Sequence, residues 1–166
     1  MGAMRRDKTF LLKLGVSAVV LFVCGVLLEY VSRPYRVARI EREANAILTA
    51  IIREGKTSPY RDQWIEYAIQ MLHAARDLDS LNQRTWLLLG AAYLMQGKPR
   101  TAIESYKAAE VIRRDHKLYT SMGYCYMHMG ELERARQCLE LALRFATDFP
   151  EALDYLADLK KRKTAR

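Results

Sequence analysis

Residues 83–115 read QRTWLLLGAAYLMQGKPRTAIESYKAAEVIRRD, and residues 116–148 read HKLYTSMGYCYMHMGELERARQCLELALRFATD. At a spacing of 33, the two stretches keep their small and their large apolar positions in register. The small and aromatic positions Gly90, Tyr93, Gly97, Ala102 and Ala109 recur as Gly123, Tyr126, Gly130, Ala135 and Ala142. A fixed spacing of this length predicts a stack of similar supersecondary units.

Each unit has the pattern of a helical hairpin. Apolar residues at three- and four-residue intervals flank a turn at Gly97 or Gly130, which predicts a helix, a turn and a second helix. In the first unit, we expect Gly90 to let the second helix approach closely. Ala102 would provide the small facing surface, and Tyr93 would fill the space beside them. The second unit repeats this arrangement.

This set of residues resembles the tetratricopeptide repeat family. The family pattern is carried in the first copy by Trp86, Leu89, Gly90, Tyr93, Ala102, Tyr106 and Ala109. The second copy carries it through Tyr119, Met122, Gly123, Tyr126, Ala135, Leu139 and Ala142. The resemblance implies an all-α solenoid of helical hairpins, with two repeats over residues 83–149.

The segment 33–82 is expected to form a helix and a degenerate hairpin that departs from the family. Lys56 stands where the family pattern has the glycine of its Leu-Gly pair, and Pro59 stands where the pattern has its tyrosine. From Tyr35 to Glu54 an amphipathic stripe predicts a helix that packs on the following one. The stripe comprises Val37, Ile40, Ala44, Leu48 and Ile51, and its expected partners are Trp64, Ala68, Met71 and Leu72. Pro34 is expected to kink or break the chain before this helix.

The segment 150–166 is expected to form a capping helix and a basic tail. Leu153, Leu156 and Ala157 repeat the start of a hairpin, and a polar run follows them. A solenoid needs such a polar helix to close its open end. The whole chain would therefore contain about seven helices.

Residues 1–32 are predicted to hold a flank and a single transmembrane helix. From Phe10 to Leu28 the only charge is Lys13, and this run would give about 28 Å of helix, enough for a bilayer core. A cleaved signal peptide is the alternative, but no small-x-small cleavage site follows the run. The basic residues tie on the two sides of the run, which leaves the orientation open. We expect a single-pass protein of a bacterial inner membrane with a cytoplasmic N-terminus and periplasmic repeats, a mitochondrial membrane being the alternative.

The net charge of +8 lies at the ends of the chain. Between Arg61 and Ala157 there are 12 Lys or Arg and 13 Asp or Glu, so the repeats are nearly neutral. This distribution favours anionic lipid headgroups over nucleic acid as partners of the basic flanks. The three cysteines indicate no disulfide framework. We expect Cys125 and Cys138 to be unpaired thiols, although a bridge between them stays open.

The family resemblance implies a concave groove lined by the first helix of each repeat. Its predicted residues are Arg84, Leu87, Ala91, Leu94, Met95, Lys117, Thr120, Tyr124, Met127 and His128. Met and aromatic side chains suit an apolar or helical segment of a partner, although Leu94, Met95 and Met127 could instead bury against neighbouring helices. Relatives that bind chaperone tails use a polar clamp where this chain has Leu87, Ala91 and Thr120. A receptor for Hsp70 or Hsp90 tails is therefore not expected.

No catalytic or metal-binding set is evident. Cys125 and His128 are spaced for two metal ligands on one helix, but no second pair completes a site. No nucleophile stands beside a base. We therefore expect no enzyme activity, no cofactor and no small-molecule substrate.

The predicted function is that of a membrane-anchored adaptor or scaffold that assembles or recruits a membrane protein complex. Its partners would be other membrane or membrane-associated proteins. Two alternatives stay open: a permanent structural subunit of a large membrane complex, and a chaperone-like accessory of secretion or translocation.

Overall fold

A computed structural model describes the backbone of residues 3–55 and 59–164 and the side chains of residues 19–55 and 59–161. Within these residues the fold consists of seven α-helices. They are α1 (Ala3–Glu54), α2 (Arg61–Leu78), α3 (Gln83–Met95), α4 (Pro99–Ile112), α5 (His116–His128), α6 (Leu132–Phe145) and α7 (Pro150–Thr164). The prediction of an all-α solenoid is confirmed.

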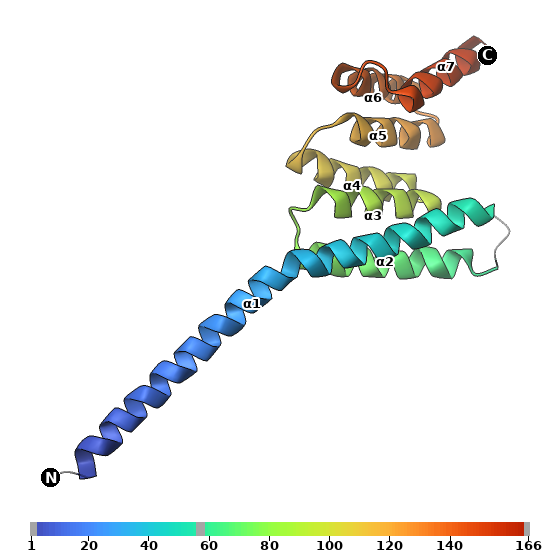
Figure 1. Ribbon diagram of the computed structural model, residues 1–166. Helices are drawn as coiled ribbons and strands as arrows, with labels where there is room; N and C mark the ends of the chain where they lie inside the picture. Colours follow the sequence, from blue (N-terminus) through green and yellow to red (C-terminus); the bar gives the residue numbers. More distant parts are fainter. Residues whose placement is uncertain (1–2, 56–58, 165–166) are drawn as a thin grey trace.

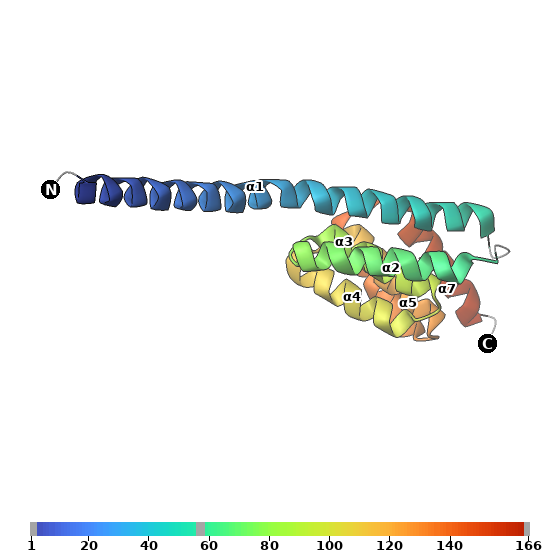
Figure 2. The same ribbon diagram turned by 90° about the horizontal axis from the view of Figure 1, so that it is seen from below.

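The helices stack as antiparallel hairpins. α1 pairs with α2, α3 with α4 and α5 with α6, and α7 packs on the last pair (Figure 1). The N-terminal half of α1 projects far beyond the stack, whereas its C-terminal half lies along α2 and α3 (Figure 2). The odd-numbered helices touch one another in sequence from α1 to α7, so they share one face of the solenoid.

Glycine shapes the turn inside each of the last two hairpins. Gly97 has φ 79°, a left-handed conformation that a side chain would disfavour. The Lys98 N–H donates to the Tyr93 carbonyl at 2.9 Å, and the Gly97 N–H donates to the Leu94 carbonyl at 2.9 Å. The turn after α5 has the same pair of bonds around Gly130, with φ 75°. Both helices therefore end in a Schellman motif, and the predicted turns are confirmed.

The other glycine of each repeat, Gly90 or Gly123, lies where the two helices of its hairpin meet. A Cβ atom at Gly90 would stand 2.4 Å from Cε1 of Tyr106, and one at Gly123 would stand 2.8 Å from Cγ of Leu139. The predicted close approach is confirmed. The nearest neighbour in both cases is the large side chain of the second helix, and at Gly123 the backbone carbonyl of Ala135 comes next at 3.3 Å.

The C-terminal half of α1 buries the predicted apolar stripe. Val37, Ala44, Leu48 and Ile51 are buried. The last three pack with Ile65, Ala68, Ile69 and Leu72 of α2 and with apolar residues of α3, whereas Trp64 is half exposed. α1 continues through Pro34 without interruption, so the expected break is absent from this helix. The loss of one backbone donor does not end so long a helix, because the neighbouring turns keep their bonds.

A buried carboxylate fixes α1 to the third helix. Glu41 is 5% exposed, and its Oε1 accepts a hydrogen bond from the hydroxyl of Thr85 at 2.7 Å. Thr85 is fully buried, and the Arg84 Nε lies 3.8 Å from Oε2 of Glu41. A buried carboxylate needs such partners to offset its loss of water.

We expect Thr85→Val to lower the free energy of unfolding by about 1 to 2 kcal/mol, because one Glu41 oxygen loses its donor inside the protein. Urea denaturation of the full chain measures the change. The matched control is Thr49→Val on the exposed side of α1, where the hydroxyl donates to the Asn45 carbonyl, and its effect should stay within about 0.5 kcal/mol. Equal effects of the two substitutions would contradict the stabilising role of the Glu41–Thr85 bond.

The predicted membrane anchor is contradicted. In the part of the chain that the structure describes, no helix combines the length and the apolarity that a bilayer crossing needs. Glu29 ends the apolar run of the predicted anchor, and α1 continues beyond it to Glu54. The first half of the predicted anchor, residues 10–18, lies outside the described side chains. The prediction of a single-pass membrane protein is corrected with it.

Candidate functional site

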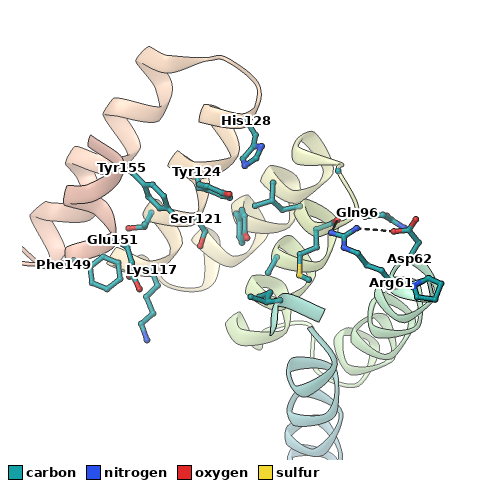
Figure 3. Close-up of a pocket in the computed structure, with 18 residues that line it drawn as sticks. Arg61, Asp62, Gln96, Lys117, Ser121, Tyr124, His128, Phe149, Glu151 and Tyr155 are labelled. Carbon is teal, nitrogen blue, oxygen red and sulfur yellow. Dashed lines mark hydrogen bonds and ion pairs between the residues drawn. The ribbon is translucent and has the colours of Figure 1, made fainter. Parts of the chain in front are cut away.

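A groove of about 1390 Å³ follows the face shared by the odd-numbered helices. Its lining residues are Ile52, Pro59, Arg61, Asp62, Ala91, Leu94, Met95, Gln96, Gly97, Tyr106, Lys117, Thr120, Ser121, Tyr124, His128, Phe149, Glu151 and Tyr155. Thus α1, α3, α5 and α7 all contribute, and the start of α2 closes one end (Figure 3). We refer to this set as the groove.

Aromatic rings form the part of the groove that lies between α5 and α7. The Tyr124 and Tyr155 ring centroids are 5.0 Å apart, and the His128 ring meets Tyr124 edge-on at 4.5 Å. Phe149, just before α7, and Glu151, in its first turn, stand nearby (Figure 3). Aromatic rings in contact supply large apolar surface with few rotatable bonds, which suits them to hold a partner segment.

Hydrogen bonds hold the opposite end of the groove in place. The Arg61 guanidinium donates to the Met95 carbonyl at 2.8 Å and pairs with Asp62 at 3.3 Å. The Gln96 amide donates to Glu66 at 2.9 Å. These contacts join the start of α2 to the end of α3. The end wall therefore exists before any ligand arrives.

The structure gathers most of the predicted groove residues. Ala91, Leu94, Met95, Lys117, Thr120, Tyr124 and His128 line the groove together. Arg84 and Leu87 lie outside it, in a second hollow at the N-terminal ends of α3 and α5. Met127 is 6% exposed and belongs to the core formed by α4, α5, α6 and α7. The binding role of these side chains stays a prediction.

The contribution of α7 to the groove was not predicted from the sequence. Tyr155 and Glu151 line the groove, although the last helix was expected only to cap the solenoid. A signal for them exists, because a shift of 34 places Glu151 at the position of Lys117 and Tyr155 at that of Ser121. Ile52 near the end of α1 was also missed.

The ionisable groups of the groove suit binding more than proton transfer. Burial raises the pKa of Tyr155, and the neighbouring Tyr124 and Glu151 raise it further. Its hydroxyl therefore stays neutral and can donate a hydrogen bond at ordinary pH. Among the described residues, no group of three or more His, Cys, Asp or Glu side chains could hold a metal ion. The expectation that this chain has no enzyme activity stays a prediction.

The cysteines are unpaired in the described chain. Cys24 is exposed, Cys125 is fully buried, and Cys138 is half-buried. Burial raises the pKa of Cys125 from its ordinary value near 9 to about 12. Burial, with a smaller effect of Glu110, raises the pKa of Cys138 to about 11. The stability that this burial provides is present below the ordinary pKa and is lost as the pH rises through the raised values.

We expect an impermeant thiol reagent at about pH 8 to modify Cys24 quickly in the folded chain, and Cys125 and Cys138 only after unfolding. At this pH, the raised pKa of Cys125 leaves on the order of 1000-fold less thiolate than the ordinary value would. Mass spectrometry of peptides labelled with and without denaturing urea identifies the modified residues. Fast labelling of Cys125 in the native chain would contradict its burial.

Comparison with known proteins identifies the repeat. Residues 116–149, which comprise α5, α6 and the loop to α7, match the family model described as a tetratricopeptide repeat. The chain contains a tetratricopeptide repeat. Comparison with curated protein sequences gives no match.

Several solved tetratricopeptide domains share the fold. The first such domain of human RPAP3 has 19% identity and a TM-score of 0.66, over 80% of this chain and 95% of that one. The first such domain of Spaghetti (RPAP3), bound to the HSP90 peptide SRMEEVD, has 19% identity and a TM-score of 0.64, over 78% and 94%. The Yersinia enterocolitica chaperone SycD, in complex with a peptide of the translocator YopD, has 24% identity and a TM-score of 0.56, over 72% and 93%. At these identities the likeness establishes the solenoid fold of this chain.

Proposed function

We propose that this chain is a protein-interaction adaptor that holds a segment of a partner protein in the groove. The observation that carries the proposal is the size and lining of the groove. Its volume of about 1390 Å³ exceeds the range of about 300–1000 Å³ that is common for small-molecule sites. An open channel across four helices fits an extended or helical peptide better than a compact metabolite.

The chemistry of the lining supports the same occupant. Leu94 and Met95 provide adaptable apolar surface on α3, and the Tyr124–Tyr155 pair provides a rigid aromatic wall. Hydroxyl and charged groups such as Ser121, Tyr155 and Lys117 are spaced along the lining, where they can bond to a peptide backbone. This combination of apolar anchors and scattered polar groups is typical of peptide grooves.

Structural neighbours agree with this proposal. The Spaghetti domain and SycD were each solved with a bound peptide. Their shared solenoid fold shows that such a framework can hold a segment of another protein. We infer that this chain holds a segment of a partner protein and thereby recruits that protein to a complex. The predicted lipid contacts of the basic flanks stay a prediction.

The test is a selection of random 15-residue peptides displayed on phage against the immobilised full chain. Selected peptides are then labelled and titrated by fluorescence polarisation. Tyr124→Ala combined with Tyr155→Ala should weaken their binding at least about 10-fold, because the aromatic wall is removed. Circular dichroism confirms that the variant is folded.

The matched control is Tyr67→Ala on α2. This tyrosine is 50% exposed and does not line the groove, so its removal should leave the affinity unchanged. Peptides that bind the double variant as tightly as the unmodified chain would show that they bind elsewhere. A selection that enriches no peptide would overturn the proposed function.

A further inference from the structure

A second hollow of about 750 Å³ opens beside the groove, at the N-terminal ends of α3 and α5. Three apolar side chains line it, from Leu81, Leu87 and Ile112, together with three cationic ones, from Arg84, Arg113 and Lys117. Lys117 also lines the groove, so the two concavities adjoin at this residue. We refer to this second hollow as the edge hollow. A partner segment that leaves the groove past Lys117 would enter it.

The carboxylate of the edge hollow is already occupied by protein donors. Asp115 caps α5 by accepting from the Leu118 N–H at 2.9 Å. Its other oxygen accepts from the Gln83 amide at 3.2 Å and from Arg113 at 3.3 Å. Gln83 is 8% exposed and also donates to the Arg113 carbonyl at 2.8 Å. This set of bonds joins α3 to the loop before α5 and leaves little acceptor capacity on Asp115.

The cations, by contrast, keep donors facing water. The Arg84 side chain is 61% exposed, and its Nε lies 3.8 Å from the carboxylate of the buried Glu41. The Arg113 side chain is 72% exposed and uses one nitrogen on Asp115. Each guanidinium has five N–H donors, so most of them remain available. The edge hollow is therefore rich in donors and poor in exposed acceptors.

We propose that the edge hollow binds an acidic stretch of the same partner segment that occupies the groove. This inference rests on the proposed function. The carboxylates of the segment meet Arg84, Arg113 and Lys117, and apolar residues between them lie on Leu81, Leu87 and Ile112. Charge-assisted bonds from arginine to carboxylate are among the stronger polar contacts, and their geometry favours a planar carboxylate. The partner is thus a peptide in which an acidic stretch directly adjoins an apolar or aromatic one.

The experiment uses the peptides selected on the full chain. We expect them to combine Asp or Glu with an adjoining apolar run. A selected peptide is compared with a copy whose acidic residues are replaced by Ser. Both are titrated against the unmodified chain and against Arg84→Gln combined with Arg113→Gln, two positions that do not line the groove.

The acidic peptide should bind the double variant about 10-fold more weakly than the unmodified chain, and the Ser copy should bind both proteins equally. The advantage of the acidic peptide should shrink as salt is raised, because exposed charges are screened. Arg100→Gln combined with Lys107→Gln provides the matched control, since both side chains are exposed on α4 outside the two concavities.

Three outcomes separate the two proposals. The selected peptides could lack acidic enrichment and depend for binding on Tyr124 and Tyr155 alone. This result would overturn the proposed role of the edge hollow and leave the proposed function of the groove in place. A selection that enriches no peptide would overturn both. A labelled single-stranded oligonucleotide could bind the unmodified chain and bind the Arg84 and Arg113 double variant more weakly. This result would assign the cations to nucleic acid binding and overturn the proposal of an acidic peptide.

Discussion

Replacing Gly90 with alanine is expected to lower the free energy of unfolding by about 2 to 3 kcal/mol. The new Cβ would stand 2.4, 2.6 and 2.7 Å from three ring atoms of Tyr106. Tyr106 is 2% exposed, so its ring cannot move aside without disturbing the core. Alanine would gain about 1 kcal/mol over glycine from helix propensity, and the expected loss is what remains after this gain.

A double-mutant cycle isolates the steric cause. Tyr106→Leu removes the outer ring atoms, so Gly90→Ala combined with Tyr106→Leu should be less destabilised than the sum of the two single variants. Gly25→Ala is the matched control, because a Cβ at this helical glycine meets nothing within 4 Å. Urea denaturation of the four proteins of the cycle and of the Gly25→Ala control measures the changes. Strict additivity would contradict a clash between the two residues.

The constraints that the sequence predicted well are those that act on one backbone position. A left-handed φ at Gly97 and a helix contact at Gly90 both exclude a side chain, and each position therefore holds glycine in both repeats. The hairpins follow from these local requirements and from apolar spacing. The first requirement lies within one turn and the second within one hairpin, so the repeats could be recognised without the structure.

The contact between Glu41 and Thr85 could not be predicted in this way. The two residues are 44 positions apart, and neither lies in an unusual sequence context. A glutamate on a helix otherwise rich in charge has the pattern of a solvated residue. Its burial depends on how α1 lies across α3, which is a property of tertiary packing alone.

The membrane prediction took residues 10–28, in which Lys13 is the only charge, as an element separate from the helix that follows. In the part of the chain that the structure describes, no helix is both long and apolar enough to cross a bilayer, and Glu29 follows the run on the same helix. α1 then continues through Pro34 into the solenoid without a boundary. A proline and a composition change suggested two separate elements, whereas backbone hydrogen bonding joins them into one helix.

The groove was predicted in part because its lining follows the repeat only as far as α5. Tyr124 and Lys117 occupy positions that the family pattern assigns to the groove. The last helix keeps few pattern residues, so its facing side chains were expected to be solvated. The repeat shift nevertheless brings Tyr155 and Glu151 to the same face, because the backbone packing of α7 on α6 and α5 continues the solenoid.

Leu139→Ala is expected to have the largest effect on stability, a loss of about 3 to 4 kcal/mol in the free energy of unfolding. Leu139 is fully buried, and it fills the space that Gly123 leaves between α5 and α6. Removing its branched end creates a cavity at the centre of that hairpin. The matched control is Leu153→Ala on α7, where the side chain is 46% exposed and the loss should stay below about 1 kcal/mol.

The loss should also be uneven along the chain, since in a solenoid each hairpin is stabilised by its immediate neighbours. Hydrogen exchange of Leu139→Ala should show amides in α5, α6 and α7 losing protection first, whereas those of α2 and the C-terminal half of α1 keep theirs under native conditions. The second core, which α1, α2 and α3 build around Leu48 and Leu72, does not contain Leu139. A uniform loss of protection from α1 to α7 would instead show that the array unfolds as one unit and that the two cores are strongly coupled.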